Sequence, residues 1–199
     1  MLCSNPCRTV DGTRLPGSVG QPLPGVSVRI VDEQGDELAA DSIGQVEVKG
    51  PNVFGGYLGM PDKTAESFTP DGWFRTGDVG HKDAQGYVHL SGRAKDLIIT
   101  GGFNVYPAEI ESHIDKLPGV IESAVIGVPH PDFGEGVVAV IVAQAGHALQ
   151  EADVIRTLKD TIAGFKVPKR VFMVDDLPRN AMGKVQKNLL RQSHQHTFA

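Results

Sequence analysis

The chain has 199 residues, 40% of them hydrophobic and 22% charged, which is typical of a globular protein with one large domain or two small ones. Its net charge of −5 and its lack of a basic block exclude an ordinary nucleic-acid-binding protein. No apolar run approaches the roughly 18 residues of a membrane span, and no apolar stretch marks a signal peptide, so we expect a cytoplasmic protein that binds no membrane.

The two cysteines, Cys3 and Cys7, lie close together in a short polar segment. A structural zinc site needs four ligands, and no pair of Cys or His residues stands ready to complete one. We therefore predict free thiols, as in a reducing cytosol, and no metal site in the chain.

Residues 1–92 are expected to form a small, mostly antiparallel β unit. The segments VSVRIVD (27–33) and GQVEVKG (44–50) alternate apolar and polar residues, with turn-forming segments between them. GWFRTGDVG (72–80) and GYVHLSG (86–92) continue this pattern. Pro61 at a helix start predicts one short helix over 61–68, in which Phe68 closes an apolar face.

Residues 93–199 mix helices with strands, which predicts a compact α+β domain. PAEIESHIDKL (107–117) and EADVIRTLKDTIA (151–163) each place apolar side chains on one helical face. ESAVIGV (122–128) and GVVAVIVA (136–143) are almost continuously apolar, as strands covered on both faces tend to be. KRVFMVDD (169–176) supplies a third strand, so the chain as a whole is predicted to be α+β.

Near the end of the chain, LPRNAMGKVQK (177–187) sets Lys184 among residues that favour loops, and a helical stretch follows. A Gly-Lys pair before a helix suggests phosphate binding. A Walker-type loop, however, needs another glycine five residues before the Gly-Lys pair and a Ser or Thr after it. Those places hold Pro178 and Val185, so Lys184 needs another explanation.

Four other residues each carry a weak signal. Asp78 follows a Thr-Gly turn, where a carboxylate can bind both hydroxyls of a ribose or simply close an Asx turn. The planar guanidinium of Arg93 suits a ribose or phosphate oxygen, or an ion pair at the domain junction. Gly101 and Gly102 serve either as turn residues or as bare backbone against which a narrow ligand lies.

Taken together, DGWFRTGD, GYVHLSGRAKDLIITGGFNVYPAEIE and LPRNAMGKVQK occur in an order and at separations that resemble the adenylate-forming superfamily. That superfamily includes acyl-CoA synthetases, adenylation domains of peptide synthetases and firefly luciferase. The resemblance covers nearly all of this chain but only the C-terminal part of a family member, and the family's phosphate loop is missing. It therefore implies a fragment, with the β end of the AMP-binding domain in 1–92 and a mobile lid domain in 93–199.

The resemblance implies roles at the nucleotide. Asp78 resembles the aspartate that binds the ribose, and Arg93 the arginine that contacts the nucleotide. Lys184 matches the adenylation lysine, the implied catalytic residue. Its ammonium would offset the repulsion between a carboxylate and the α-phosphate of ATP, most strongly in the transition state.

The resemblance also implies a second half-reaction with coenzyme A. Lys95 falls at the hinge about which the C-terminal domain rotates between the half-reactions. Gly101 and Gly102 resemble the edge of the channel for the pantetheine arm. The implied partners are a small carboxylic acid, ATP with Mg²⁺, coenzyme A and the missing N-terminal domain.

The implied function is that of an acid–thiol ligase. Segments such as GPNVFGGYLGMPDKTAESF (50–68) most resemble, in their residue pattern, the malonyl-CoA synthetase branch. Another small or aromatic acid stays open as the substrate. The sequence is also compatible with an adenylation domain that loads a carrier protein, and with a binding module without catalysis. We expect the fragment alone to be inactive, and its β part to expose apolar surface.

Several other polar residues receive purely structural interpretations. Glu109 and Glu111 are interpreted as acids of a first helical turn, favourable near the positive end of the helix dipole. Lys166 is interpreted as a solvated loop lysine and His194 as a solvated tail residue. The loop around His130, with Asp132 and Glu135, is interpreted as a structural turn.

Overall fold

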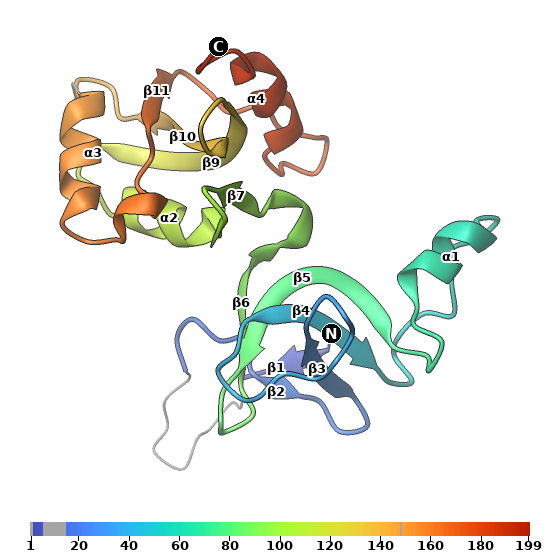
Figure 1. The fold of residues 1–199 in the computed structure, drawn as a ribbon. Coiled ribbons are helices and arrows are strands. Elements are labelled where there is room, and N and C mark those ends of the chain that lie inside the picture. Colours follow the sequence, from blue (N-terminus) through green and yellow to red (C-terminus); the bar gives the residue numbers. More distant parts are fainter. Residues whose placement is uncertain (1, 6–14, 148) are drawn as a thin grey trace. The chain divides into compact units, whose positions relative to one another are not determined.

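The structure is a computed structural model that describes residues 2–5, 15–147 and 149–199. It divides into two compact units, Met1–Lys95 and Asp96–Ala199, each built of strands and helices (Figure 1). The predicted α+β class is confirmed. The assignment of 1–92 to an AMP-binding domain and of 93–199 to a mobile lid stays a prediction. Cys3 carries a free thiol, as expected, and Cys7 lies outside the described residues.

The first unit is built on a four-stranded antiparallel sheet, whose strands in spatial order are β3 (Ser27–Val31), β4 (Gly44–Lys49), β5 (Phe74–Lys82) and β6 (Val88–Arg93). The unit also contains the short antiparallel pair β1 (Cys3–Ser4) and β2 (Gln21–Pro22), and the helix α1 (Pro61–Ser67). All four strands of the larger sheet were predicted. The helix ends one residue earlier than predicted, because Phe68 is extended and forms a bridge with Phe74.

The alternation of apolar and polar residues gives this sheet one buried face. Val28 lies opposite Val48 and Ile30 lies opposite Val46, so that the four side chains form cross-strand pairs in one core cluster. Val88 of β6 joins the same cluster. The core of the first unit therefore follows directly from the period of two in its strands.

The second unit is built on a five-stranded sheet with helices on both faces. Its elements in chain order are β7 (Ile98–Thr100), β8 (Phe103–Val105), α2 (Pro107–Ile114), β9 (Val120–His130), β10 (Gly134–Ala143), α3 (Glu151–Lys159), β11 (Arg170–Val174) and α4 (Lys187–His194). β9 and β10 form a long antiparallel hairpin, and β11 runs parallel to β10 after a crossover through α3. Thr100 of β7 pairs with Gly134 at the turn end of that hairpin.

The β9–β10 hairpin is apolar on both faces because helices cover both. One set of its side chains packs with Ile110 of α2 and Leu158 of α3. The alternate set packs with Leu190 of α4. In Figure 1, α2 and α3 lie on one side of the hairpin and α4 lies on the other. The prediction of strands covered on both faces is confirmed.

Two helices of the second unit are shorter than predicted. α2 ends at Ile114 and not at Leu117, and Pro118 follows the turn that the chain makes after the helix. The side chain of Leu117 still packs on the core. α3 ends at Lys159, and Ile162 likewise packs on the core from the turn beyond it. In both cases the apolar periodicity continues past the last helical residue, so the pattern overestimated the length.

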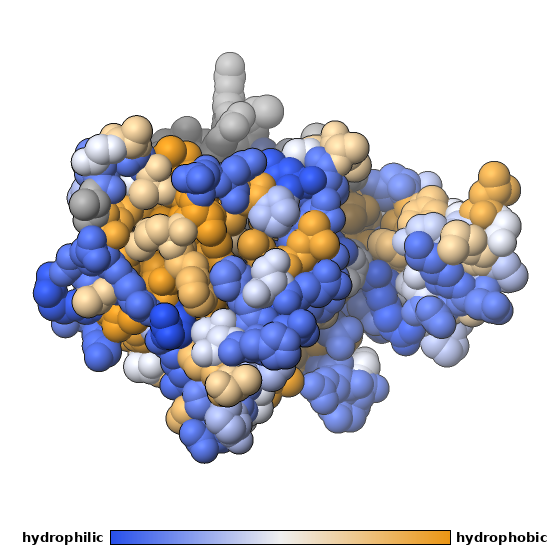
Figure 2. Space-filling model, turned by 90° about the horizontal axis from the view of Figure 1, so that it is seen from above, coloured by the Kyte–Doolittle hydropathy of each residue, from blue (hydrophilic) through white to orange (hydrophobic). Residues whose placement is uncertain are grey.

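Apolar side chains also reach the surface, where orange areas lie among the blue ones in Figure 2. The large apolar residues exposed in the first unit are Val19, Ile43, Phe54, Leu58, Met60 and Leu90. Leu58 is completely exposed, which agrees with the expectation of apolar surface on the β part.

Candidate functional site

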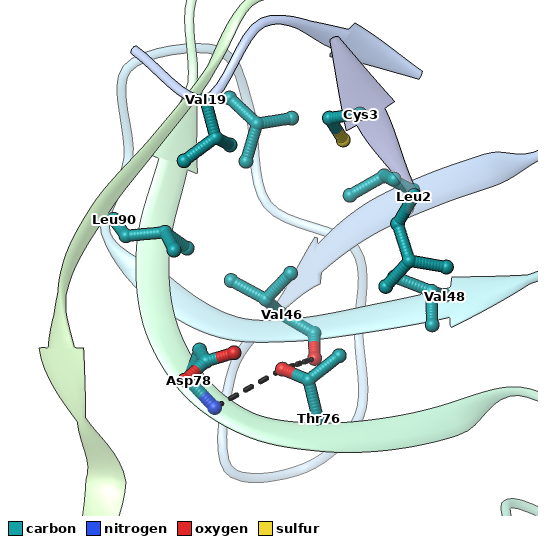
Figure 3. A pocket seen from close by; sticks show the side chains of 10 residues that line it. Leu2, Cys3, Val19, Val46, Val48, Thr76, Asp78 and Leu90 are labelled. Atoms are coloured by element: carbon teal, nitrogen blue, oxygen red, sulfur yellow. Dashed lines mark hydrogen bonds between the residues drawn. The ribbon is translucent and has the colours of Figure 1, made fainter. Parts of the chain in front are cut away.

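Asp78 lies on a bulge of β5, where Thr76, Gly77 and Asp78 together stand opposite Val46 of β4. Gly77 has a φ of +74°, a left-handed conformation that glycine adopts without strain. The Thr76 hydroxyl donates to the carbonyl of Val46 (2.9 Å) and accepts from the N–H of Asp78 (3.0 Å), as Figure 3 shows. The Thr-Gly pair before Asp78 was expected to form a turn. It forms a bulge instead, and β5 continues through Asp78 to Lys82.

The structure brings together the two residues predicted to bind the nucleotide. Asp78 and Arg93 lie opposite each other in the β5–β6 pair, and Nη1 of Arg93 donates to Oδ1 of Asp78 over 2.8 Å. The side chain of Arg93 is 51% exposed and that of Asp78 is 26% exposed. An exposed pair of this kind contributes at most about 1 kcal/mol, so a ligand with hydroxyls and a phosphate can replace it.

A hollow of about 240 Å³ lies beside Asp78. Figure 3 shows Asp78 and Thr76 among aliphatic side chains such as Leu90 and Val46, with Cys3 at the opposite wall. Burial raises the pKa of the Cys3 thiol, which favours its neutral form. The hollow can therefore accept an apolar group next to a carboxylate, a group able to accept hydrogen bonds from hydroxyls.

Gly101 and Gly102 are the two central residues of the β7–β8 turn, because Thr100 pairs with Phe103. Their φ values are +57° and +81°, the left-handed pattern of a type I′ hairpin turn. The N–H of Gly101 donates to the carbonyl of Phe133 (2.9 Å). A Cβ added to Gly102 would meet no atom of the described residues within 4 Å, whereas one on Gly101 would lie 3.4 Å from the Phe133 ring. The turn alone explains both glycines, and the space over Gly102 is open.

Lys184 lies in a closed loop, residues 179–187, which we call the lysine loop. A bridge between Arg179 and Val185 closes it, and Lys187 at its end is also the first residue of α4. The side-chain oxygen of Asn180 accepts hydrogen bonds from the N–H groups of Met182 and Lys184, both at 3.0 Å, and the N–H of Asn180 donates to the Lys184 carbonyl (2.9 Å). The backbone of Lys184 is thus held on both sides. Its side chain is exposed and makes no hydrogen bond or ion pair with any residue that the structure describes.

The lysine loop and the glycine turn lie at opposite ends of the β9–β10 hairpin. Arg179 of the loop pairs with Glu122 at one end of β9, whereas the glycine turn lies beside the 130–134 turn at the other end. An extended strand from Glu122 to His130 spans about 26 Å at 3.3 Å per residue. Within the second unit, Lys184 and the glycines are therefore held far apart.

Lys95 is exposed and belongs to a single turn of 3₁₀ helix, Ala94–Asp96. Arg93 before it is paired with Asp78 of the first unit, and Asp96 after it is paired with Arg191 of α4 over 2.7 Å. Lys95 is also the last residue of the first compact unit. It thus lies between two anchored residues that belong to different units.

Two family models match the chain. The model of the AMP-binding enzymes covers residues 1–58, and that of the AMP-binding enzyme C-terminal domain covers residues 109–184. The chain belongs to the adenylate-forming superfamily. The resemblance on which the site residues were chosen is therefore confirmed at the level of the superfamily.

Three relatives of this adenylate-forming chain are each longer than it. ATP-bound MatB from Rhodopseudomonas palustris is 59% identical with a TM-score of 0.93, over 100% of this chain and 39% of that one. A CoA ligase from Rhodococcus jostii that acts on a methyl-dioxo-octahydroindenyl propanoate is 48% identical over 94% of this chain and 34% of its own length. A malonate–CoA ligase from Arabidopsis thaliana is 39% identical over 97% of this chain and 33% of its own length. The chain thus spans about a third of the curated relatives it matches.

Two structural interpretations of polar residues were wrong. Lys166 is not a solvated lysine, because its ammonium donates to both carboxylate oxygens of Glu109, at 2.7 and 2.8 Å. His194 is not solvated either, since its ring stacks on Phe172 with centroids 4.4 Å apart and desolvation lowers its pKa. Both partners come from distant parts of the chain, which sequence reasoning did not foresee.

Glu111 and Glu122 are residues near the candidate site that sequence reasoning missed or underrated. Glu111, interpreted as a helix acid, accepts from the backbone N–H of Val125 (2.7 Å) and from Lys187 (2.6 Å). Glu122 binds Arg179 of the lysine loop. No local pattern marks either glutamate, because the cationic partner of each is more than 50 positions away.

The remaining expectations concern metals and membranes. Within residues 2–5, 15–147 and 149–199, no group of three or more His, Cys, Asp or Glu side chains could hold a metal ion. The loop at His130 is the turn between β9 and β10, in which Nδ1 of His130 accepts from the N–H of Asp132. No helix in the described part of the chain is long and apolar enough to cross a membrane.

Proposed function

We propose that this chain is the C-terminal part of an ATP-dependent acid–thiol ligase. In the first half-reaction a carboxylate oxygen bonds to the α-phosphorus of ATP and pyrophosphate leaves. In the second, the sulfur of coenzyme A bonds to the acyl carbon, its proton is released and AMP leaves. Such a ligase would work in the cytoplasm, where both ATP and coenzyme A are available.

The observation that carries this proposal is the ammonium of Lys184, which has no partner among the described residues and lies on a fixed loop. Two anions, the carboxylate and the triphosphate, must approach each other in the first half-reaction. A cation that no described protein group neutralises can lie between them, and it stabilises the charge that develops as the phosphorus–oxygen bonds change. A salt-bridged lysine would first have to give up its own partner.

The other candidate residues take supporting roles in this proposal. Asp78 would exchange Arg93 for the two ribose hydroxyls, and Arg93 would then contact the nucleotide oxygens. The open side of Gly102 would border the pantetheine arm. Mg²⁺ would accompany the pyrophosphate, but the described residues offer no set of ligands for it, so we assign no step to it.

For the acid we propose malonate. The support is the similarity to the malonate–CoA ligase of Arabidopsis thaliana. The Rhodococcus relative acts on a far larger acid although its identity, 48%, exceeds the 39% of the malonate ligase. Identity in this part of the chain therefore does not select the acid by itself, and the acid has to be measured.

The test uses the complete protein, in which this chain follows its N-terminal domain. In a second experiment, this chain replaces the matched 39% of MatB in a chimera, which tests the catalytic groups of the chain but not its acid. AMP release is followed with ATP, coenzyme A and a panel of malonate, oxalate, larger dicarboxylates and aromatic acids. We expect kcat/KM for malonate to exceed that for every other acid by about tenfold or more, because a wrong substrate would leave buried polar groups unpaired.

The outcomes separate the parts of the proposal. A higher kcat/KM for another acid would remove malonate and leave the ligase. Acyl transfer to a carrier protein but not to coenzyme A would favour an adenylation domain that loads such a carrier. Absence of acid-dependent AMP release in both proteins would contradict the proposed function as a whole.

A further inference from the structure

The lysine loop carries three cations, Arg179, Lys184 and Lys187, and two of them are paired with glutamates from other elements. We infer that these glutamates, Glu122 and Glu111, are positioning residues for the adenylation step. They hold the loop at both ends and leave Lys184 as the loop cation that has no partner in the described part of the chain. The inference rests on the proposed function of Lys184.

Glu122 holds the first end of the loop. This glutamate lies on β9, opposite Val142, and its carboxylate accepts from Nη2 of Arg179. Nη1 of the same guanidinium donates to the carbonyl of Gly183 over 2.7 Å. Through its hydrogen bond, Glu122 raises the pKa of Arg179. One planar guanidinium thus joins the sheet to the residue directly before Lys184, a geometry that a flexible ammonium could not provide.

Glu111 holds the second end. The ammonium of Lys187 lies 2.6 Å from Oε1 of Glu111, and that oxygen also accepts from the backbone N–H of Val125. Both side chains are only 18% exposed, so the pair is screened less than a surface ion pair. It joins α2, β9 and the first residue of α4, three positions after Lys184.

The two pairs act on geometry and on charge together. Between the two pairs, the side-chain oxygen of Asn180 accepts from the backbone N–H of Lys184. The two ion pairs and this hydrogen bond together fix the position of the Cα of Lys184. Without the glutamates, Arg179 and Lys187 would be unpaired cations close to Lys184 and would compete with it for the phosphate. Misplacement of a catalytic group by about 1 Å can cost about a hundredfold in rate.

The test compares two isosteric changes, Glu122→Gln and Glu111→Gln, in the complete protein. Glutamine at 111 keeps an oxygen for the N–H of Val125 and removes only the charge that binds Lys187. The matched control is Asp153→Asn, which breaks an exposed ion pair with Arg156 in α3 of the same unit. Lys187→Arg keeps the ion pair with Glu111 and serves as the conservative variant.

Each half-reaction is measured separately, by pyrophosphate release from acid and ATP and by thioester formation from a preformed acyl-adenylate. We expect each glutamine variant to lower kcat of adenylation about ten- to a hundredfold with little change in KM for ATP, and to leave thioester formation within about twofold. Lys187→Arg and Asp153→Asn should keep both rates within about threefold of the parent. Amide hydrogen exchange at Met182 and Lys184 should become faster in the glutamine variants alone.

A merely structural role would give a different pattern, because a damaged second unit would impair both half-reactions. Equal losses in both, or unchanged adenylation in both glutamine variants, would overturn the inference. Unchanged amide exchange in the loop would overturn it as well. If the parent protein adenylates an acid and the Lys184→Ala variant does not, any of these three outcomes removes only the positioning role of the glutamates and leaves the proposed function of Lys184. If Lys184→Ala adenylates as well as the parent, the proposed function of Lys184 fails first.

Discussion

Replacing Lys184 by alanine should separate a catalytic charge from the stability of the fold. The side chain is exposed and has no partner among the described residues, while the backbone is held by Asn180 and does not depend on the side chain. The free energy of unfolding should therefore change by less than about 0.5 kcal/mol. Loss of one preorganised charge at the reacting phosphate should slow adenylation about 10²–10³-fold, or about 2.7–4 kcal/mol of transition-state stabilisation.

The measurement uses the complete protein and three readouts. Pyrophosphate release with saturating acid and ATP gives the first half-reaction, and thioester formation from preformed acyl-adenylate gives the second. Urea denaturation gives the free energy of unfolding. Lys159→Ala is the matched control, because Lys159 is an exposed lysine on α3 of the same unit. It should leave all three readouts near those of the parent.

Three results would refute this reasoning. Adenylation that falls by less than about tenfold would mean that the ammonium does not stabilise the transition state. Equal losses in both half-reactions would point to a general defect of the second unit. A loss of about 2 kcal/mol or more in stability would show that the side chain has a structural contact, contrary to its exposure.

The remaining predictions concern the hinge, the turn, a partly buried histidine and the isolated chain. Lys95→Pro should slow thioester formation and spare adenylation, because proline fixes φ where a hinge needs two values; equal slowing of both steps would contradict this. Gly102→Ala should lower the free energy of unfolding by about 1–2 kcal/mol through its left-handed φ, and Gly102→Asn by less; urea denaturation distinguishes them. Because desolvation lowers the pKa of His194 below its ordinary 6.5, the unfolded chain binds the proton first as pH falls. The free energy of unfolding should then decrease below about pH 6.5, and His194→Gln should flatten that slope where the exposed His196→Gln does not. Residues 1–199 alone should release no AMP from acid, ATP and coenzyme A, and detectable release would refute the view that the chain needs an N-terminal domain.

Local patterns were enough to predict most of the fold. Alternating residues predicted the four strands of the larger sheet in the first unit, because apolar side chains on one face of that sheet form a core cluster, although Val31 and Glu47 are buried as well. Continuous apolar runs gave β9 and β10, because α2 and α4 cover opposite faces. The three residues of β8 were missed, since a strand so short carries no period, although the Gly101–Gly102 turn beside it was recognised.

The candidate site was predictable only where its residues belong to local motifs. Asp78, Arg93 and Lys184 lie in such motifs, and the structure adds that Asp78 and Arg93 are paired. The ion pairs of Glu111 with Lys187 and Glu122 with Arg179 join residues 76 and 57 positions apart. Contacts over such separations depend on how α2, β9 and α4 pack, so no spacing in the sequence indicates them.

The distance between the lysine loop and the glycine turn has a consequence for the proposed reaction. The lysine loop and the glycine turn lie at opposite ends of β9, which spans about 26 Å from Glu122 to His130, so the two cannot lie at the same acyl carbon at once. If Lys184 serves adenylation and the glycines border the thiol, the second unit must turn between the half-reactions. Arg93 and Asp96 are each tied to their own unit by an ion pair, so the change in backbone angles falls on Ala94 and Lys95 between them. The same geometry explains why one residue without a catalytic group, Lys95, should control which half-reaction the protein performs.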